Sequence, residues 1–226
     1  MPASVPAAFA SETVQVTVNR TNIPVLFGTA SGRTTPYQAS VTAIAVGPLP
    51  LNSAKSVFPA GLPAFPNNLA LKYGQEISIT NPDGNWISGD WGWLDLTGGG
   101  ANGLAGNITN GCSCTLTVGD RVTPKTGENW GPVQSAVNSL ADGTLAPATL
   151  TGNEPQLVTV PIVTPFSGAN SPVTVEGFAE VWLIGISKSG KAQTLEVEFV
   201  RYVSNKAVAG GGPNDFGAYS KPILVQ

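Results

Sequence analysis

The loop from residue 81 to residue 95 holds the densest set of side chains that could bind a ligand. Four of these side chains carry oxygen atoms suited to Ca²⁺, and the glycines between them permit sharp turns. These candidate calcium ligands are Asp83, Asn85, Asp90 and Asp95. Their spacing matches no EF-hand or RTX loop. The residue types therefore suit a hard cation, but the pattern is not a specific signature of a calcium site.

Three tryptophans of the same loop, Trp86, Trp91 and Trp93, could stack against a sugar ring. Indole rings that find a partner for their N–H group more often pack into a hydrophobic core. The loop therefore predicts either a glycan-binding surface, with or without calcium, or a tryptophan-rich part of the core.

Paired carboxylates provide the only candidate for catalysis. Glu196 and Glu198 share one face of a predicted strand, and Asp90 and Asp95 form a second pair. A retaining glycosidase needs two carboxyl groups about 5–5.5 Å apart across a cleft. Solvated carboxylates on a strand are the commoner case, so a glycosidase is the weakest of the functional hypotheses.

Two glycine-rich stretches match nucleotide-binding motifs without the structural context that those motifs need. Residues 98–103 fit G-x-G-x-x-G, but Gly106 and Asn107 predict no more than a short helical turn over residues 104–109. Residues 185–191 fit G-x-x-x-x-G-K, yet they join two predicted strands and lack the Ser or Thr that would follow the lysine. Neither stretch predicts a nucleotide site.

The composition argues against several further classes of protein. The 226 residues include no histidine, which removes Ser-His and Cys-His catalytic pairs and imidazole-ligated metals. Only 11% of the residues are charged, the net charge is −3, and no basic stripe is present to bind nucleic acid. No apolar run reaches the roughly 18 residues of a membrane-spanning helix, so no transmembrane segment is predicted.

The two cysteines, Cys112 and Cys114, are separated by one residue. Residues i and i+2 of a strand lie on the same face, so a tight disulfide is possible. Two ordinary thiols near a turn explain the pair equally well. Two cysteines alone cannot supply the four ligands of a structural zinc site.

The periodicity predicts a mostly β fold of the β-rich α+β class, built as an antiparallel sheet or a sandwich. A long hairpin is expected over residues 173–203, around a turn at 188–190, and one short helix near residues 130–142. Alternating apolar and polar residues indicate seven strands, at 12–20, 38–47, 75–80, 114–122, 156–164, 173–186 and 192–203.

The sequence predicts a single β-rich domain spanning residues 1–226, with an apolar tail at each end. The N-terminal tail covers residues 1–11, which lack the basic start of a signal peptide, and the C-terminal tail covers residues 218–226. Free tails usually fray, so ordered tails would dock on their own chain or on a neighbour. Docking on a neighbour would build a filament by exchange of a terminal strand.

Several blocks of the sequence resemble the C-terminal region of TadE/TadG-like proteins, which belong to bacterial tight-adherence (Flp) pilus assembly. The first block is the sequence GWLDL followed by a glycine run and then by Asn-Gly, at residues 92–111. A second block at residues 118–136 resembles the family's VGD-V-T, K-x-G and GPV segments, and residues 175–179 resemble its V-x-GFA strand. Residues 14–45 are similar to the strands that precede these blocks.

The resemblance implies a non-enzymatic structural or assembly role in a pilus or surface-adhesion apparatus. It implies an extracytoplasmic location, at the cell surface, in the periplasm or secreted. It implies partners that are other copies or other pilus subunits, in an oligomer or polymer, and it brings no cofactor and no catalytic residue. Family members usually begin with a hydrophobic membrane anchor, and this sequence has none.

Overall fold

The computed structural model describes residues 13–23, 36–63, 73–81, 92–125, 130–168 and 171–225. The chain forms two compact units: unit 1 consists of residues 1–48 and 222–226, and unit 2 consists of residues 49–221. This division differs from the single domain that the sequence predicts. Its physical reason is strand pairing, because the described strands of unit 1 pair only with one another.

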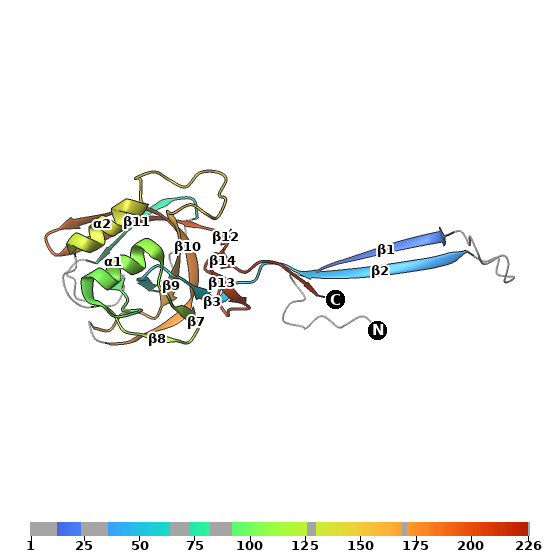
Figure 1. The fold of residues 1–226 in the computed structure, drawn as a ribbon, viewed down its shortest axis with the longest axis horizontal. Coiled ribbons are helices and arrows are strands. Elements are labelled where there is room, and N and C mark those ends of the chain that lie inside the picture. The colour runs from blue at the N-terminus through green and yellow to red at the C-terminus, as the bar shows by residue number, and fades with distance from the viewer. Residues whose placement is uncertain are drawn as a thin grey trace. The chain divides into compact units, whose positions relative to one another are not determined.

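Unit 1 is a three-stranded antiparallel sheet in the order β1, β2, β15 (Figure 1). Strand β1 spans Thr13–Ile23, β2 spans Tyr37–Val46, and β15 spans Ile223–Val225. The two long strands pair along most of their length, whereas β15 pairs only with residues 44–46 of β2. Beyond those residues the described part of unit 1 is therefore a two-stranded ribbon.

Unit 2 is built on a seven-stranded sheet in the order β5, β11, β10, β9, β4, β6, with β8 also paired to β10. All of these pairings are antiparallel except that between β4 and β9. The strands are β4 (Ala60–Pro63), β5 (Glu76–Asn81), β6 (Gly92–Trp93), β8 (Arg121–Val122), β9 (Leu157–Val163), β10 (Val173–Ser189) and β11 (Ala192–Val200). The predicted hairpin is confirmed, because β10 and β11 pair around the turn at 189–192.

Two small sheets complete unit 2. One has the order β13, β3, β7, with strands at Ala207–Gly210, Leu51–Lys55 and Thr115–Thr117. The other joins β12 (Tyr202–Val203) and β14 (Ala218–Tyr219) in parallel. The predicted C-terminal tail at 218–226 thus contributes β14 to unit 2 and β15 to unit 1, whereas residues 1–11 lie outside the described part of the chain.

The described part of the chain contains two helices, α1 (Gly100–Asn110) and α2 (Trp130–Leu140), which pack against each other (Figure 1). Helix α2 agrees with the predicted helix near residues 130–142. The prediction of only a short turn at 104–109 was wrong, because α1 has 11 residues. Leu104 and Ile108 lie one turn apart and are buried, so packing of this face outweighs the poor helix propensity of glycine and asparagine.

The core of unit 2 lies between the curled sheet and the helices. Its largest fully buried side chains include Phe166, Phe178 and Phe199, supplied by β10, β11 and the segment after β9. Of the described residues, 49% lie in strands and 13% in helices, which confirms the mostly β class. Among the described residues, neither helix has the length and apolar character needed to cross a bilayer.

Candidate functional site

The structure places one of the three candidate tryptophans, Trp93, in the core. Its side chain is 5% exposed, its ring packs against Phe58 with the centroids 6.0 Å apart, and its Nε1 donates to Oε1 of Gln193 at 3.3 Å. No sugar can stack on a ring buried in this way, so Trp93 drops out of the predicted glycan surface. Trp86 and Trp91 lie outside the described residues.

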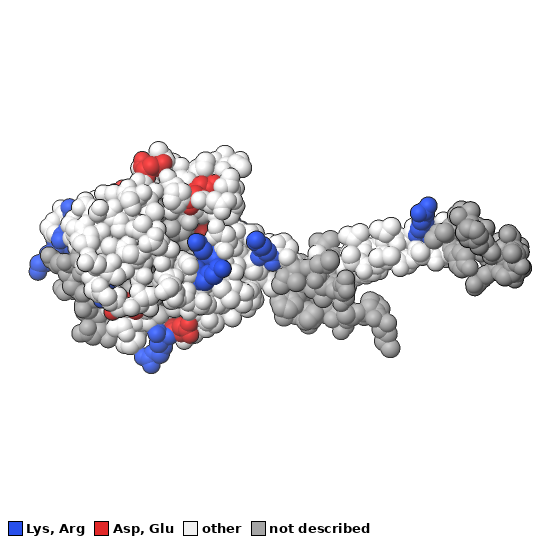
Figure 2. Space-filling model, in the orientation of Figure 1, with Lys and Arg blue, Asp and Glu red and all other residues white. Residues whose placement is uncertain are grey.

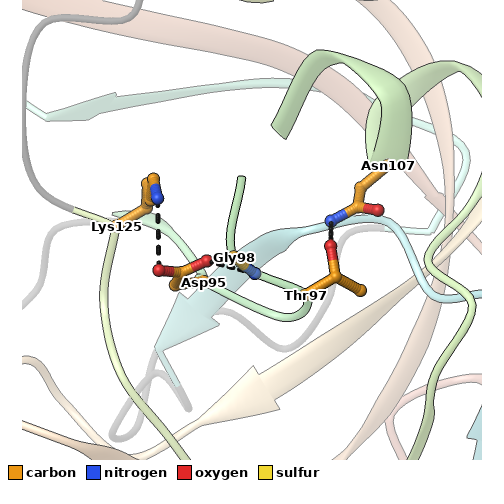
Figure 3. A network of polar contacts seen from close by, with 5 residues as sticks. All are labelled: Asp95, Thr97, Gly98, Asn107 and Lys125. Carbon is orange, nitrogen blue, oxygen red and sulfur yellow. Dashed lines mark hydrogen bonds and ion pairs between the residues drawn. The ribbon is translucent and has the colours of Figure 1, made fainter. Parts of the chain in front are cut away.

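Asp95 organises the turn that leads into α1 (Figure 3). Its Oδ1 accepts a hydrogen bond from the Gly98 amide at 2.9 Å, and its Oδ2 pairs with the Lys125 ammonium at 3.1 Å. The Asn107 side chain donates to the hydroxyl of Thr97 at 2.8 Å and ties this turn to the helix. Asp95 therefore has a structural role here.

The other predicted calcium ligands, Asp83, Asn85 and Asp90, lie outside the described residues. Within the described part of the chain, no three His, Cys, Asp or Glu residues are placed to hold a metal ion. The calcium site and the Asp90–Asp95 pair stay predictions of the sequence alone.

The glycine run at 98–103 serves close packing. A Cβ atom on Gly103 would overlap the carbonyl oxygen of Gly98, and Gly99 has φ of 87°, in the left-handed region that favours glycine. Helix α1 connects β6 to β7, which belong to different sheets. A dinucleotide site needs a helix between two parallel strands of one sheet, so the topology agrees with the prediction that this motif binds no nucleotide.

The carboxylates of Glu196 and Glu198 lie on β11 in different surroundings. Glu198 is buried and its Oε2 accepts a hydrogen bond from the Ala146 amide at 2.8 Å, while Glu196 is half-buried opposite Gly185 of β10. The Glu198 carboxylate thus holds the loop after α2 against the sheet. This hydrogen bond gives Glu198 a structural role.

Cys112 and Cys114 form a disulfide, with 5.1 Å between their Cα atoms. The bond closes the turn between α1 and β7, and Cys112 is buried in the same hydrophobic core as Leu104 and Ile108. The structure therefore selects the bonded form from the two alternatives that the sequence leaves open.

A buried polar network joins the two central strands of unit 2. Glu180 of β10 is 2% exposed, and its Oε1 accepts a hydrogen bond from the Thr159 hydroxyl of β9 at 2.5 Å. The Thr159 Oγ1 also contacts Oγ of Ser204 at 2.9 Å. Burial raises the pKa of Glu180 to about 6, against the opposing effects of the two hydroxyls and of the Lys206 charge.

The β1–β2 ribbon of unit 1 presents an exposed apolar face. Val16 is paired with Ala43 and Val18 with Val41, so these side chains share one face of the ribbon. Val16, Val18 and Val41 are 53%, 63% and 68% exposed. The opposite face of the ribbon is polar between these two pairs, where the hydroxyl oxygens of Thr17 and Thr42 lie 3.1 Å apart.

Charge is almost absent from this ribbon. Arg20 is the only charged residue among the described residues of unit 1, and the β1–β2 ribbon is white in Figure 2 apart from one blue side chain. Unit 2, in contrast, shows red and blue side chains scattered over the visible face. A contiguous apolar surface of this kind is typical of an interaction site. We call the face formed by Val16, Val18, Val41 and Ala43 the valine face.

Comparison of the chain with protein-family models, with curated proteins and with solved structures found no match in any of the three.

Proposed function

We propose that this chain is a non-enzymatic structural domain of an extracytoplasmic pilus or cell-surface adhesion apparatus, and that unit 1 is its assembly surface. The observation that carries the proposal is the valine face, on which three valines are more than half exposed. The resemblance of the sequence to TadE/TadG-like proteins suggests the kind of apparatus.

The low stability expected of an isolated two-stranded ribbon supports an assembly role. A two-stranded antiparallel ribbon is marginally stable in water, and it becomes stable when further strands or a packed face are added. Outside residues 44–46, the described strands β1 and β2 pair only with each other. A partner that covers the valine face would remove apolar surface from water, at about 25 cal/mol per Å².

Strand β15 offers a route from one subunit to the next. The chain leaves unit 2 after Lys221, and residues 223–225 then pair with β2 of unit 1. The same three residues of a neighbouring copy could occupy this position in the same register. Exchange that closes between two copies gives a dimer, whereas exchange that continues from copy to copy gives a filament.

The disulfide supports an extracytoplasmic location. Disulfides persist in oxidising compartments and are rare in the cytosol, where thiols are kept reduced. The bond between Cys112 and Cys114 is therefore the pairing expected of a periplasmic, secreted or surface protein.

Strand exchange is tested by mixing two variants that each add one cysteine to the disulfide-bonded pair Cys112–Cys114. The added cysteines, Ala45→Cys and Leu224→Cys, stand at paired positions in the register of β2 and β15. A disulfide between them can form only between two copies, so exchange predicts a cross-linked dimer of one of each on a non-reducing gel. The control mixture pairs Leu224→Cys with Ser40→Cys, a position of β2 that β15 does not reach.

Cross-linking in the first mixture and its absence in the control would support exchange at the register of the structure. Equal cross-linking in both mixtures, or none in the first, would overturn exchange and leave packing of the valine face as the only mode of assembly in the proposal.

A further inference from the structure

Unit 2 contains a cavity of about 300 Å³ that none of the predicted functions uses. It is lined by the last turn of α1, the end of α2 at Leu140, the loop and strand at 152–159, the segment after β3 at 56–58, and the turn at 205–206. This volume lies at the lower end of the range for small-molecule sites. The cavity can therefore accept one small ring.

The polar wall of the cavity is rich in groups that both donate and accept hydrogen bonds. It includes the amides of Asn110, Asn153 and Asn205 and the hydroxyl of Ser56. Asn110 and Asn205 each donate one bond to a backbone carbonyl, of Gly106 and Gly152, which fixes their amide groups. Asn153 is exposed and makes no hydrogen bond with another described residue, so both ends of its amide are available.

The charges that line the cavity balance. Lys206 contributes one positive charge and forms no ion pair with a described residue, and Glu154 contributes one negative charge. Hydrogen bonds from the amide and hydroxyl of Thr151 and from the Gly152 amide lower the pKa of Glu154 to about 2, so it stays ionised at neutral pH. The lining residues therefore carry no net charge that would select an anion or a cation.

The remaining wall is apolar and firmly held. Leu140 and Val158 are half-buried and supply apolar surface to the cavity, and Thr159 belongs to the network with Glu180. Ser56 has φ of 51°, in the left-handed region that non-glycine residues rarely adopt. Backbone strain of this kind persists where surrounding structure enforces it and is often found at binding sites.

We infer that this cavity binds one neutral sugar unit of a glycan. A sugar ring presents hydroxyls that donate and accept hydrogen bonds, which suits the asparagine amides and the serine hydroxyl. It also presents C–H faces, which suit the half-buried apolar side chains of Leu140 and Val158. No residue that lines this site belongs to the segment 81–95 or to the valine face, and the site adds a recognition function to the assembly role.

The inference is tested with the full chain by saturation-transfer NMR against glucose, galactose, mannose and N-acetylglucosamine, followed by a glycan array. The variants are Asn153→Ala and Lys206→Ala, because neither side chain makes a hydrogen bond or an ion pair with a described residue. The matched control is Asn138→Ala, an exposed asparagine of α2 that does not line the cavity. Trialanine serves as a neutral peptide probe.

The expected result is binding of at least one sugar, weakened about tenfold by each cavity variant and unchanged by Asn138→Ala. No binding to any sugar or array glycan would overturn the inference, and so would binding that the cavity variants leave unchanged. Binding of trialanine in the absence of sugar binding would assign the cavity to a peptide and would also overturn it.

Discussion

The double variant Val18→Lys, Val41→Glu is expected to lose self-association while remaining folded. The two residues are directly opposed on β1 and β2, so the new side chains form an opposite-charge pair across the ribbon, which favours the hairpin. Both valines are already more than half exposed, and the substitution therefore removes little packing within the subunit. A partner that covers the face would have to desolvate two charges.

The matched control is Thr17→Lys, Thr42→Glu, which places the same charge pair on the opposite face of the same ribbon. Sedimentation velocity over a range of protein concentrations would show an increase on the order of a hundredfold in the concentration needed for assembly of the valine variant. The threonine control should assemble as the parent does. Parent-like assembly of the valine variant would contradict the proposed surface.

The variant Glu180→Gln is expected to change how stability depends on pH. The pKa of the Glu180 carboxyl is about 6 in the folded chain and about 4.5 in an unfolded chain. Burial of the ionised form therefore costs stability above pH 6, and this cost disappears as the pH falls through 6 towards 4.5. The contribution of protonated Glu180 to the stability of the fold is thus fully present below pH 4.5 and is lost as the pH rises through 6.

This rise in the pKa of Glu180 corresponds to a change of about 2 kcal/mol in the free energy of unfolding between pH 4.5 and pH 7. Urea unfolding of the parent and of Glu180→Gln at several pH values would give the difference in the free energy of unfolding. That difference should change by about this amount across the window, and Glu176→Gln on the same strand should behave as the parent. A constant difference between parent and Glu180→Gln would show that the carboxyl does not titrate in this window.

The features that the sequence predicts well are those set by neighbouring residues. The hairpin of β10 and β11 follows from long alternating segments on both sides of Lys188, Ser189 and Gly190. Helix α2 has a proline in its first turn and apolar residues at helical spacing, and Gly143 follows soon after its last residue, Leu140. Both signals are local, and both elements form where they are expected.

The features that the sequence fails to predict depend on distant contacts. Helix α1 forms because Leu104 and Ile108 are buried against the rest of unit 2, a gain that glycine and asparagine propensities do not reveal. The pairing of β15 with β2 joins residues at opposite ends of the chain, for which no local pattern exists. Division into two units follows from this pairing.

The candidate sites show the same dependence on tertiary structure. The alternation of valine and threonine in β1 predicts an apolar face, but only the structure shows that Val16, Val18 and Val41 remain exposed. Trp93 was a candidate for sugar stacking by residue type alone, and its burial removes it. Glu180 has no sequence signal at all, because its burial arises when β9 and the segment at Ser204 cover β10.

The assembly claim is tested most directly by the state of the purified parent chain, measured by sedimentation velocity and negative-stain electron microscopy with the disulfide intact. The proposal predicts oligomers or filaments that grow with protein concentration through unit 1. A chain that stays monomeric at every concentration, with its valine face permanently in water, would contradict it.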